Sequence, residues 1–211
     1  MVEFHNRQYS LDERGEKMSK LFTTKKMALM GVITALSVIL YFIEVQLPFI
    51  APDFYKLDLS DIPIMIGSFI LGPIAGGIME LVKNLIHLLI TRTGGVGELA
   101  NFAIGCAFVI PASIIYKYKK TVHGAIVGLA VSILCMAIVG GLMNYFVMLP
   151  LYGVNDQACA GMGKALGNYI IDKKTMVLFA VVPFNAIKGF IDSFITLLVY
   201  KRLSEFIKKH I

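Results

Sequence analysis

Asn185 and Lys188 stand within residues 181–200, a stretch that is otherwise apolar enough to span a bilayer. A lysine at membrane depth costs roughly 3 kcal/mol or more, so it normally faces a bundle interior or a cavity and marks a ligand or ion path. The two residues are three positions apart and therefore share one face of a helix. Together they offer amide donors, an amide acceptor and a cation. We therefore predict that the chain holds a polar ligand inside a membrane domain.

Three further polar residues fall in apolar stretches. Glu98 and Asn101 are three positions apart in G-E-L-A-N-F, where Glu98 either caps a helix or contacts a ligand. Asn144 lies in G-G-L-M-N-Y-F-V-M-L-P and either makes an interhelical hydrogen bond or contributes to the ligand site. The second interpretation is supported because Asn144, Asn185 and Lys188 all fall toward the outer half of neighbouring predicted helices.

A polar stripe of four residues, spaced 0, 3, 4 and 7, lies on one face of a third predicted span and comprises Glu80, Lys83, Asn84 and His87. We interpret it as internal neutralisation, with Glu80 pairing with Lys83, and as helix–helix hydrogen bonding rather than ligand contact. No second histidine stands at ligand spacing, so no metal site is predicted. The sequence lacks H-E-x-x-H, G-x-S-x-G, Walker A and glycine-rich dinucleotide motifs. We therefore expect no enzyme activity, and a transporter containing this chain must take ATP energy from another polypeptide.

The elements that position these residues are membrane helices. The chain is 57% hydrophobic and 16% charged, a composition far from that of typical soluble proteins. Its length of 211 residues corresponds to one domain. Its net charge of +6 comes from basic clusters between the apolar runs, the pattern of cytoplasmic loops rather than of nucleic-acid binding. These clusters are Lys17, Lys20, Lys25 and Lys26; Lys117, Lys119 and Lys120; and Lys201, Arg202, Lys208 and Lys209.

The number of spans depends on residues 62–90. Apolar runs long enough, or nearly long enough, to cross a bilayer occupy about 26–43, 99–116, 123–148 and 176–200. If 62–90 were one helix, the chain would have five spans and two basic clusters would lie outside. A turn near Gly72-Pro73 gives six spans and returns every basic cluster to the cytoplasm. We predict an all-α membrane protein with six transmembrane helices in one bundle and both termini cytoplasmic.

The predicted organisation is a polar cytoplasmic lead at 1–24, a six-helix substrate-binding domain at 25–205 and a cytoplasmic tail at 206–211. The lead has no apolar core with a cleavage site, so it is not a signal peptide. The outside loop at 45–61 either folds over the mouth of the bundle as a lid or is an ordinary connection. Small residues on the first span, Ala28, Gly31 and Ala35, either pack within the bundle, which the sequence favours, or dock another membrane protein.

Five segments in order resemble the riboflavin-specific substrate-binding (S) component of bacterial energy-coupling factor (ECF) transporters, over about residues 25–205. They are K-L-D-L-S-D-I-P, L-G-P-I-A-G-G-I-M-E-L-V-K-N-L-I-H, G-E-L-A-N-F, N-Y-F-V-M-L-P-L-Y and P-F-N-A-I-K-G-F-I-D-S. The resemblance implies a multi-pass protein of the bacterial cell membrane whose six helices bind one vitamin in a pocket open to the outside. It also implies a lid at 45–58 and a separate module of two ATPases and a transmembrane scaffold that drives uptake.

The resemblance further implies that Asn144, Asn185 and Lys188 bind riboflavin, which is a transported substrate and not a cofactor. Asparagine amides and a lysine suit the pyrimidine edge of the isoalloxazine ring, while aromatic and aliphatic contacts suit its faces. We assign those apolar contacts to Tyr41, Leu57, Phe102 and Met148. The contacts to the ribityl hydroxyls are assigned to the lid or to Glu98, and Asn101 is a further ligand-binding residue. The family's small-residue motif on the first helix usually has alanines four positions apart. Here the residue four positions after Ala28 is Val32, whereas Gly31 and Ala35 are two small residues at that spacing.

Three other classes stay open. An S component for a different vitamin would keep the helices and change the pocket groups. A structural or scaffold membrane protein would use the polar residues only for helix association. An autonomous secondary transporter would need a coupling-ion or proton site, for which Glu80 and Glu98 are the candidates.

Overall fold

The structure is a computed structural model that describes residues 23–46, 55–91, 94–163 and 169–210, with side chains up to residue 200. The predicted lead therefore lies almost wholly outside the described residues. The last helix continues through most of the predicted tail, to His210.

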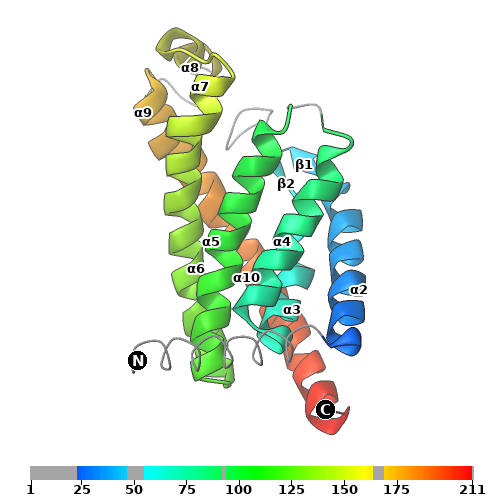
Figure 1. Cartoon of the computed structure of the whole chain (residues 1–211). Helices are drawn as coiled ribbons and strands as arrows, with labels where there is room; N and C mark the ends of the chain where they lie inside the picture. Colours follow the sequence, from blue (N-terminus) through cyan, green and yellow to red (C-terminus); the bar gives the residue numbers. More distant parts are fainter. Residues whose placement is uncertain (1–22, 47–54, 92–93, 164–168, 211) are drawn as a thin grey trace, which may run out of the picture.

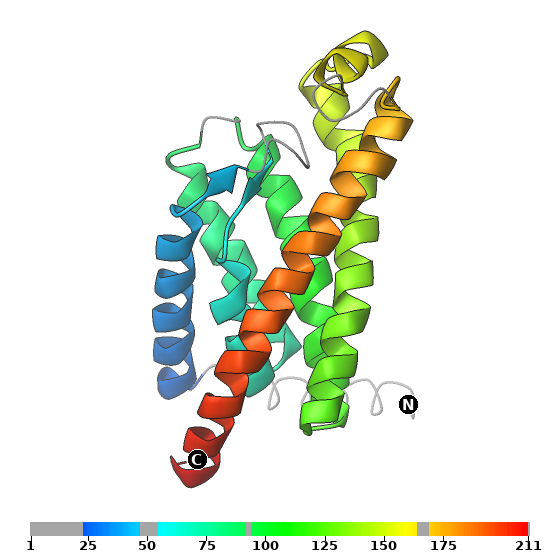
Figure 2. The same ribbon diagram turned by 180° about the vertical axis from the view of Figure 1, so that it is seen from behind.

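Within the described ranges the chain is almost entirely helical, as predicted. The helices pack into one bundle, with α2 on one flank (Figure 1) and α10 running obliquely across the face nearest the viewer in Figure 2. In chain order the helices are α2 (Thr24–Tyr41), α3 (Asp61–Leu71), α4 (Pro73–Leu88), α5 (Val96–Tyr118), α6 (Val122–Met143), η1 (Asn144–Met148), α7 (Leu149–Leu151), α8 (Asp156–Gly163), α9 (Lys173–Met176), η2 (Val177–Val181) and α10 (Val182–His210).

Four helical stretches of the described chain are long and apolar enough to cross a membrane: Thr24–Tyr41, Val96–Tyr118, Val122–Leu151 and Lys173–Tyr200. Two of them each contain a π-helical turn, η1 or η2, flanked by α-helix. Such turns insert an extra residue, change which side chains share a face, and occur often at functional sites. The chain is thus built as a multi-pass membrane protein.

The helix break predicted at Gly72-Pro73 is confirmed, since α3 ends at Leu71 and α4 begins at Pro73. Gly72 has a φ of 97°, a backbone conformation that side-chain-bearing residues rarely adopt. Pro73 lacks an N–H, which costs nothing in the first turn of a helix. The reversal packs α3 against α4 and leaves both shorter than the four long helices.

A two-residue antiparallel pair follows α2. Strand β1 (Val45–Gln46) pairs with β2 (Lys56–Leu57), with Val45 opposite Leu57. The pair lies at the same end of the bundle as the end of α4 (Figure 2). Residues 47–54 between the strands lie outside the described part of the chain, so the lid remains a prediction.

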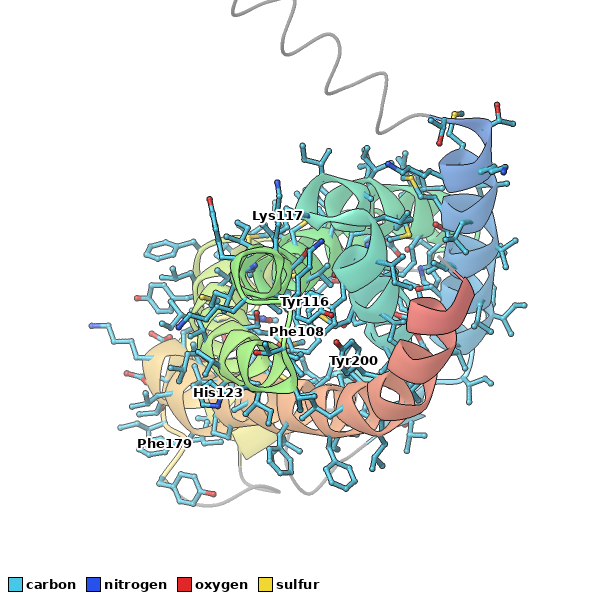
Figure 3. All side chains as sticks on the ribbon, turned by 90° about the horizontal axis from the view of Figure 1, so that it is seen from below. Phe108, Tyr116, Lys117, His123, Phe179 and Tyr200 are labelled. Atoms are coloured by element: carbon cyan, nitrogen blue, oxygen red, sulfur yellow. The ribbon has the colours of Figure 1, made fainter. Side chains whose placement is uncertain are left out.

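The opposite end of the bundle is filled with apolar and aromatic side chains. Phe108 is fully buried in the main core, which α3, α4, α5 and α6 share. Below it, the ring of Tyr116 lies 4.6 Å from that of Phe69 and 5.6 Å from that of Tyr200, between ring centroids. Figure 3 shows Phe108, Tyr116 and Tyr200 pointing into the interior, in contrast to Lys117 at the rim. The described side chains at this end of the bundle thus form a packed aromatic and apolar core.

Candidate ligand-binding cavity

A cavity of about 540 Å³ lies at the end of the bundle that carries the β1–β2 pair. This volume is within the ~300–1,000 Å³ typical of small-molecule sites. Side chains from α2, β2, α3, α4, α5, α6, η1 and α10 form its wall. The lining residues used below are Tyr41, Tyr55, Lys56, Asp58, Asp61, His87, Gly97, Glu98, Asn101, Asn144, Met148, Phe184, Asn185 and Lys188.

Seven of the predicted ligand contacts line this one cavity, although they come from four separate elements. They are Tyr41, Glu98, Asn101, Asn144, Met148, Asn185 and Lys188. The structure thus brings together the three residues that the sequence singled out first with four of the residues assigned around them.

Leu57 and Phe102 are not placed in the cavity wall. Successive side chains of a strand point to opposite sides, so Lys56 and Asp58 line the cavity while Leu57 packs against the apolar cluster that contains Leu149 and Val181. Phe102 follows the lining residue Asn101 on α5, and one residue turns a helix by about 100°, which takes its side chain out of the wall.

The two asparagines are held by their own helices. The Nδ2 group of Asn144 donates to Gly140 O at 2.8 Å, and that of Asn185 donates to Val181 O at 2.9 Å. Gly140 is necessary for this arrangement because a Cβ there would lie 2.7 Å from Asn185 Cγ. Each asparagine is thereby oriented with one N–H used, and the rest of the Asn185 amide remains available to other partners.

Tyr55, which the sequence did not single out as a binding residue, fixes the other side of Asn144. Its hydroxyl donates to Asn144 Oδ1, and its ring lies 5.6 Å from that of Phe184. Burial raises the pKa of the Tyr55 hydroxyl well above its usual range, so the hydroxyl stays protonated and acts as the donor. The only hint in the sequence was its position just before K-L-D-L-S-D.

Lys188 is paired at the floor of the cavity. Its Nζ lies 2.8 Å from Asp58 Oδ2 and 3.1 Å from Asp61 Oδ2, and all three side chains are buried. The two aspartates were missed in the sequence analysis. Their signal was the spacing of three in D-L-S-D immediately before an apolar helix, together with a buried lysine that had no assigned partner.

The predicted pairing of Glu80 with Lys83 is confirmed, with Glu80 Oε2 2.7 Å from Lys83 Nζ. Lys83 also lies 2.6 Å from Asp61 Oδ1 and 3.2 Å from the Ser60 hydroxyl. Asp61 therefore bridges the two lysines, one on each oxygen, and connects α3 to α4 and α10. Burying one charged group alone would cost several kcal/mol, which this shared pairing offsets.

The wall formed by α2, α4 and α5 holds a second polar group. The His87 ring stacks on Tyr41 with 3.9 Å between centroids, and His87 Nδ1 lies 2.9 Å from Glu98 Oε1. Asn101 Nδ2 donates to the Tyr41 hydroxyl at 2.9 Å. The expectation that His87 bonds between helices is confirmed, and His87 additionally lines the cavity. Glu98 also lies in the first turn of α5, where a carboxylate is favourable.

The small-residue face of the first helix does not pack within the bundle, contrary to the interpretation favoured from sequence. Ala28, Gly31 and Ala35 are exposed, and nothing lies within 4 Å of a Cβ built on Gly31. The helix instead buries a neighbouring stripe of larger residues, comprising Met30, Thr34, Ser37 and Tyr41. The small-residue face is thus open to lipid or to another protein.

Comparison with known families agrees with this architecture. Residues 25–200 match the family model of the ECF transporter, substrate-specific component. The chain belongs to this family. Members of this family are described as transporter components and not as enzymes, which agrees with the expectation drawn from the missing catalytic motifs.

Individual members of the family align over nearly the whole S component. The chain is 35% identical to the riboflavin transporter RibU of Staphylococcus aureus, over 92% of this chain and 98% of that protein. It is 29% identical to the riboflavin transporter FmnP of Bacillus subtilis, over 88% of this chain and 95% of that protein. A solved structure described as the S component of a bacterial ECF transporter superposes with a TM-score of 0.72 at 36% identity, covering 87% of this chain and 98% of the other.

Proposed function

We propose that this chain is the riboflavin-binding S component of an ECF transporter, which captures the vitamin from outside for uptake driven by a separate ATP-hydrolysing module. The observation that carries the proposal is the convergence of Asn144, Asn185 and Lys188 on one cavity. It is supported by membership of the family and by relatives that are named riboflavin transporters.

The cavity has the groups that a flavin requires. Isoalloxazine is flat and carries carbonyls, ring nitrogens and an N–H along its pyrimidine edge, which we assign to Asn144, Asn185 and Lys188. Met148 and Phe184 supply the apolar contact that the ring faces need. The polar wall of His87, Glu98 and Asn101 faces the same cavity and is assigned to the hydroxyls of the ribityl chain.

In the membrane we place the four long helices together with α3 and α4 as six spans of a domain at 25–205, with both termini cytoplasmic. This placement puts the turn between α5 and α6, with Lys117, Lys119 and Lys120, on the cytoplasmic side. The cavity lies at the other end of α5, next to Gly97 and Glu98. It therefore opens to the outside in this arrangement.

The partners in uptake are a transmembrane scaffold protein and two ATPase subunits. The chain has no Walker A loop, so ATP energy comes from other polypeptides. The exposed small-residue face of α2, comprising Ala28, Gly31 and Ala35, lets a partner helix approach closely.

An autonomous secondary transporter is less well supported. The two carboxylates named as candidates for a coupling-ion site are both engaged, Glu80 with Lys83 and Glu98 with His87. An S component for a different vitamin would share the fold, so the ligand has to be tested directly. After purification from a flavin-containing host, the protein should show absorbance at the flavin bands. A colourless preparation that also gains no such absorbance on mixing with riboflavin would contradict the proposal.

A further inference from the structure

The Lys188 ammonium is oriented by two carboxylates. An ammonium has three N–H donors. Asp58 Oδ2 at 2.8 Å and Asp61 Oδ2 at 3.1 Å account for two of them. Lys188 also lines the cavity, so the third N–H is the one available to a ligand.

The carboxylates are fixed in turn. Asp58 Oδ1 accepts hydrogen bonds from the Ser60 backbone N–H at 3.0 Å and from the Ser60 hydroxyl. Asp61 Oδ1 is held by Lys83 at 2.6 Å. The Ser60 carbonyl accepts a hydrogen bond from the Ser37 hydroxyl, which anchors this segment to α2. Neither carboxylate can rotate away from Lys188 without breaking a second contact.

The ammonium groups at this point are matched by carboxyl groups. Lys83 and Lys188 lie in one buried network with Asp58, Asp61 and Glu80. Lys188 therefore presents an oriented N–H donor to the cavity rather than an uncompensated cation. A neutral acceptor suits such a donor, whereas an anionic group would approach the two carboxylates as well.

We propose that Asp58 and Asp61 are positioning residues that hold the Lys188 ammonium with one N–H directed at a neutral acceptor of the ligand. This inference rests on the proposed function, because it concerns how the same cavity binds a flavin. Asp58 and Asp61 line the cavity themselves, so the alternative is that they contact the ligand directly. The two possibilities differ in whether their effect on affinity depends on Lys188.

A double-mutant cycle separates them. Asp58→Asn, Lys188→Met and the double variant are titrated with riboflavin and with lumiflavin, which keeps the ring and lacks the ribityl chain. We expect Asp58→Asn to weaken affinity about 10-fold for both ligands, as for a lost charge-assisted hydrogen bond. In the Lys188→Met background the same change should alter affinity less than about 2-fold. Equal losses in both backgrounds, or an Asp58→Asn variant that binds as tightly as the parent, would overturn the proposal.

Two further variants keep the test decisive. Glu80→Gln removes a carboxylate from the same network that contacts Lys83 and not Lys188, so it should lower thermal stability and leave affinity unchanged. If Asp58→Asn does not fold, Ser60→Ala is used instead. It removes the hydroxyl that donates to Asp58 and accepts from Lys83, and its smaller loss of affinity should likewise vanish when Lys188 is absent. A loss that persists without Lys188 contradicts the positioning role. If the unsubstituted chain itself does not bind riboflavin, the proposed function fails instead. That outcome is distinct from a failure of the positioning role, which is judged only by comparing the variants with a parent that binds.

Discussion

Lys188 Nζ and Asp58 Oδ2 lie 2.8 Å apart and join two positions separated by 130 residues of sequence. The pairing explains how a lysine is tolerated in a span: its charge is met inside the protein, and only the cost of desolvation remains. It also ties the segment after β2 to α10 at the floor of the cavity. Lys188, which indicated the site in the sequence, therefore also connects distant parts of the bundle.

The amide of Asn185 should contribute directly to binding. Asn185→Ala is expected to weaken riboflavin affinity by about 1–3 kcal/mol, the cost of losing buried hydrogen bonds. The matched control is Asn84→Ala, because Asn84 is also buried and bonded to its own helix but does not line the cavity. The control should lower the melting temperature and spare affinity. Comparable affinity losses in both variants, measured by fluorescence titration, would contradict the assignment.

Gly140 should be required for the position of Asn185. Gly140→Ala places a Cβ 2.7 Å from Asn185 Cγ, so the asparagine must shift and affinity should fall. Gly77→Ala is the comparison, since its Cβ would meet the nearest side chain at an ordinary 3.7 Å. That variant should be neutral or slightly more stable, because alanine favours a helix by about 1 kcal/mol over glycine. Unchanged riboflavin affinity in Gly140→Ala would show that the close approach of α6 and α10 is not needed.

The six-span topology places the two ends of α6 on opposite sides of the membrane. Single cysteines at Gln157 and Lys119, both exposed, are introduced into a background lacking Cys106, Cys135 and Cys159. An impermeant thiol reagent applied to sealed right-side-out cells should label position 157 and not position 119. The five-span alternative predicts the reverse pattern, so labelling only at 119 would restore it.

The small-residue face of α2 should be needed for uptake and not for binding. Gly31→Leu and Ala35→Leu are expected to abolish assembly with the energy-coupling module while keeping riboflavin affinity, because this face is exposed and lies away from the cavity. Val32→Leu on the same exposed side changes little in volume and serves as the control. Normal uptake in both leucine variants, or loss of affinity together with uptake, would contradict docking at this face.

Two buried aspartates should differ in their effect on stability. Asp61→Asn leaves Lys83 and Lys188 without their shared carboxylate, which should cost about 3–5 kcal/mol. Asp192 is fully buried, and neither of its carboxyl oxygens has a hydrogen-bond partner among the described residues. Asp192→Asn replaces a buried carboxyl group that makes no hydrogen bond to the described residues, so the melting temperature of the variant should equal or exceed that of the parent. A large destabilisation in Asp192→Asn alone would reverse this ordering.

Local spacing predicted much of the site. The shared face of Asn185 and Lys188 and the pairing of Glu80 with Lys83 follow from helical periodicity, and the break at Gly72 follows from backbone chemistry. Contacts between distant segments did not follow, because the pairing of Asp58 with Lys188 depends on how α3 packs against α10. Strand β2, which directs Leu57 away from the cavity, was likewise not predicted, because two residues are too few to show the alternation typical of a strand.

The exposed face of α2 was mispredicted for a related reason. A stripe of small residues has the same sequence signature whether the helix that it contacts lies in the same chain or in another. Only the packed structure shows that Met30 and Thr34 face inward while Gly31 faces out. The π-helical turns η1 and η2 were not predicted either, because one inserted residue does not stand out in a continuous apolar stretch.

Titration of the purified chain alone with riboflavin, followed by quenching of flavin fluorescence, tests the central claim most directly. A cavity that combines Asn144, Asn185 and Lys188 with apolar walls predicts saturable quenching with a dissociation constant in the nanomolar range, or about −12 kcal/mol. The absence of saturable quenching below micromolar riboflavin, in a preparation shown to be folded and monodisperse, would contradict it.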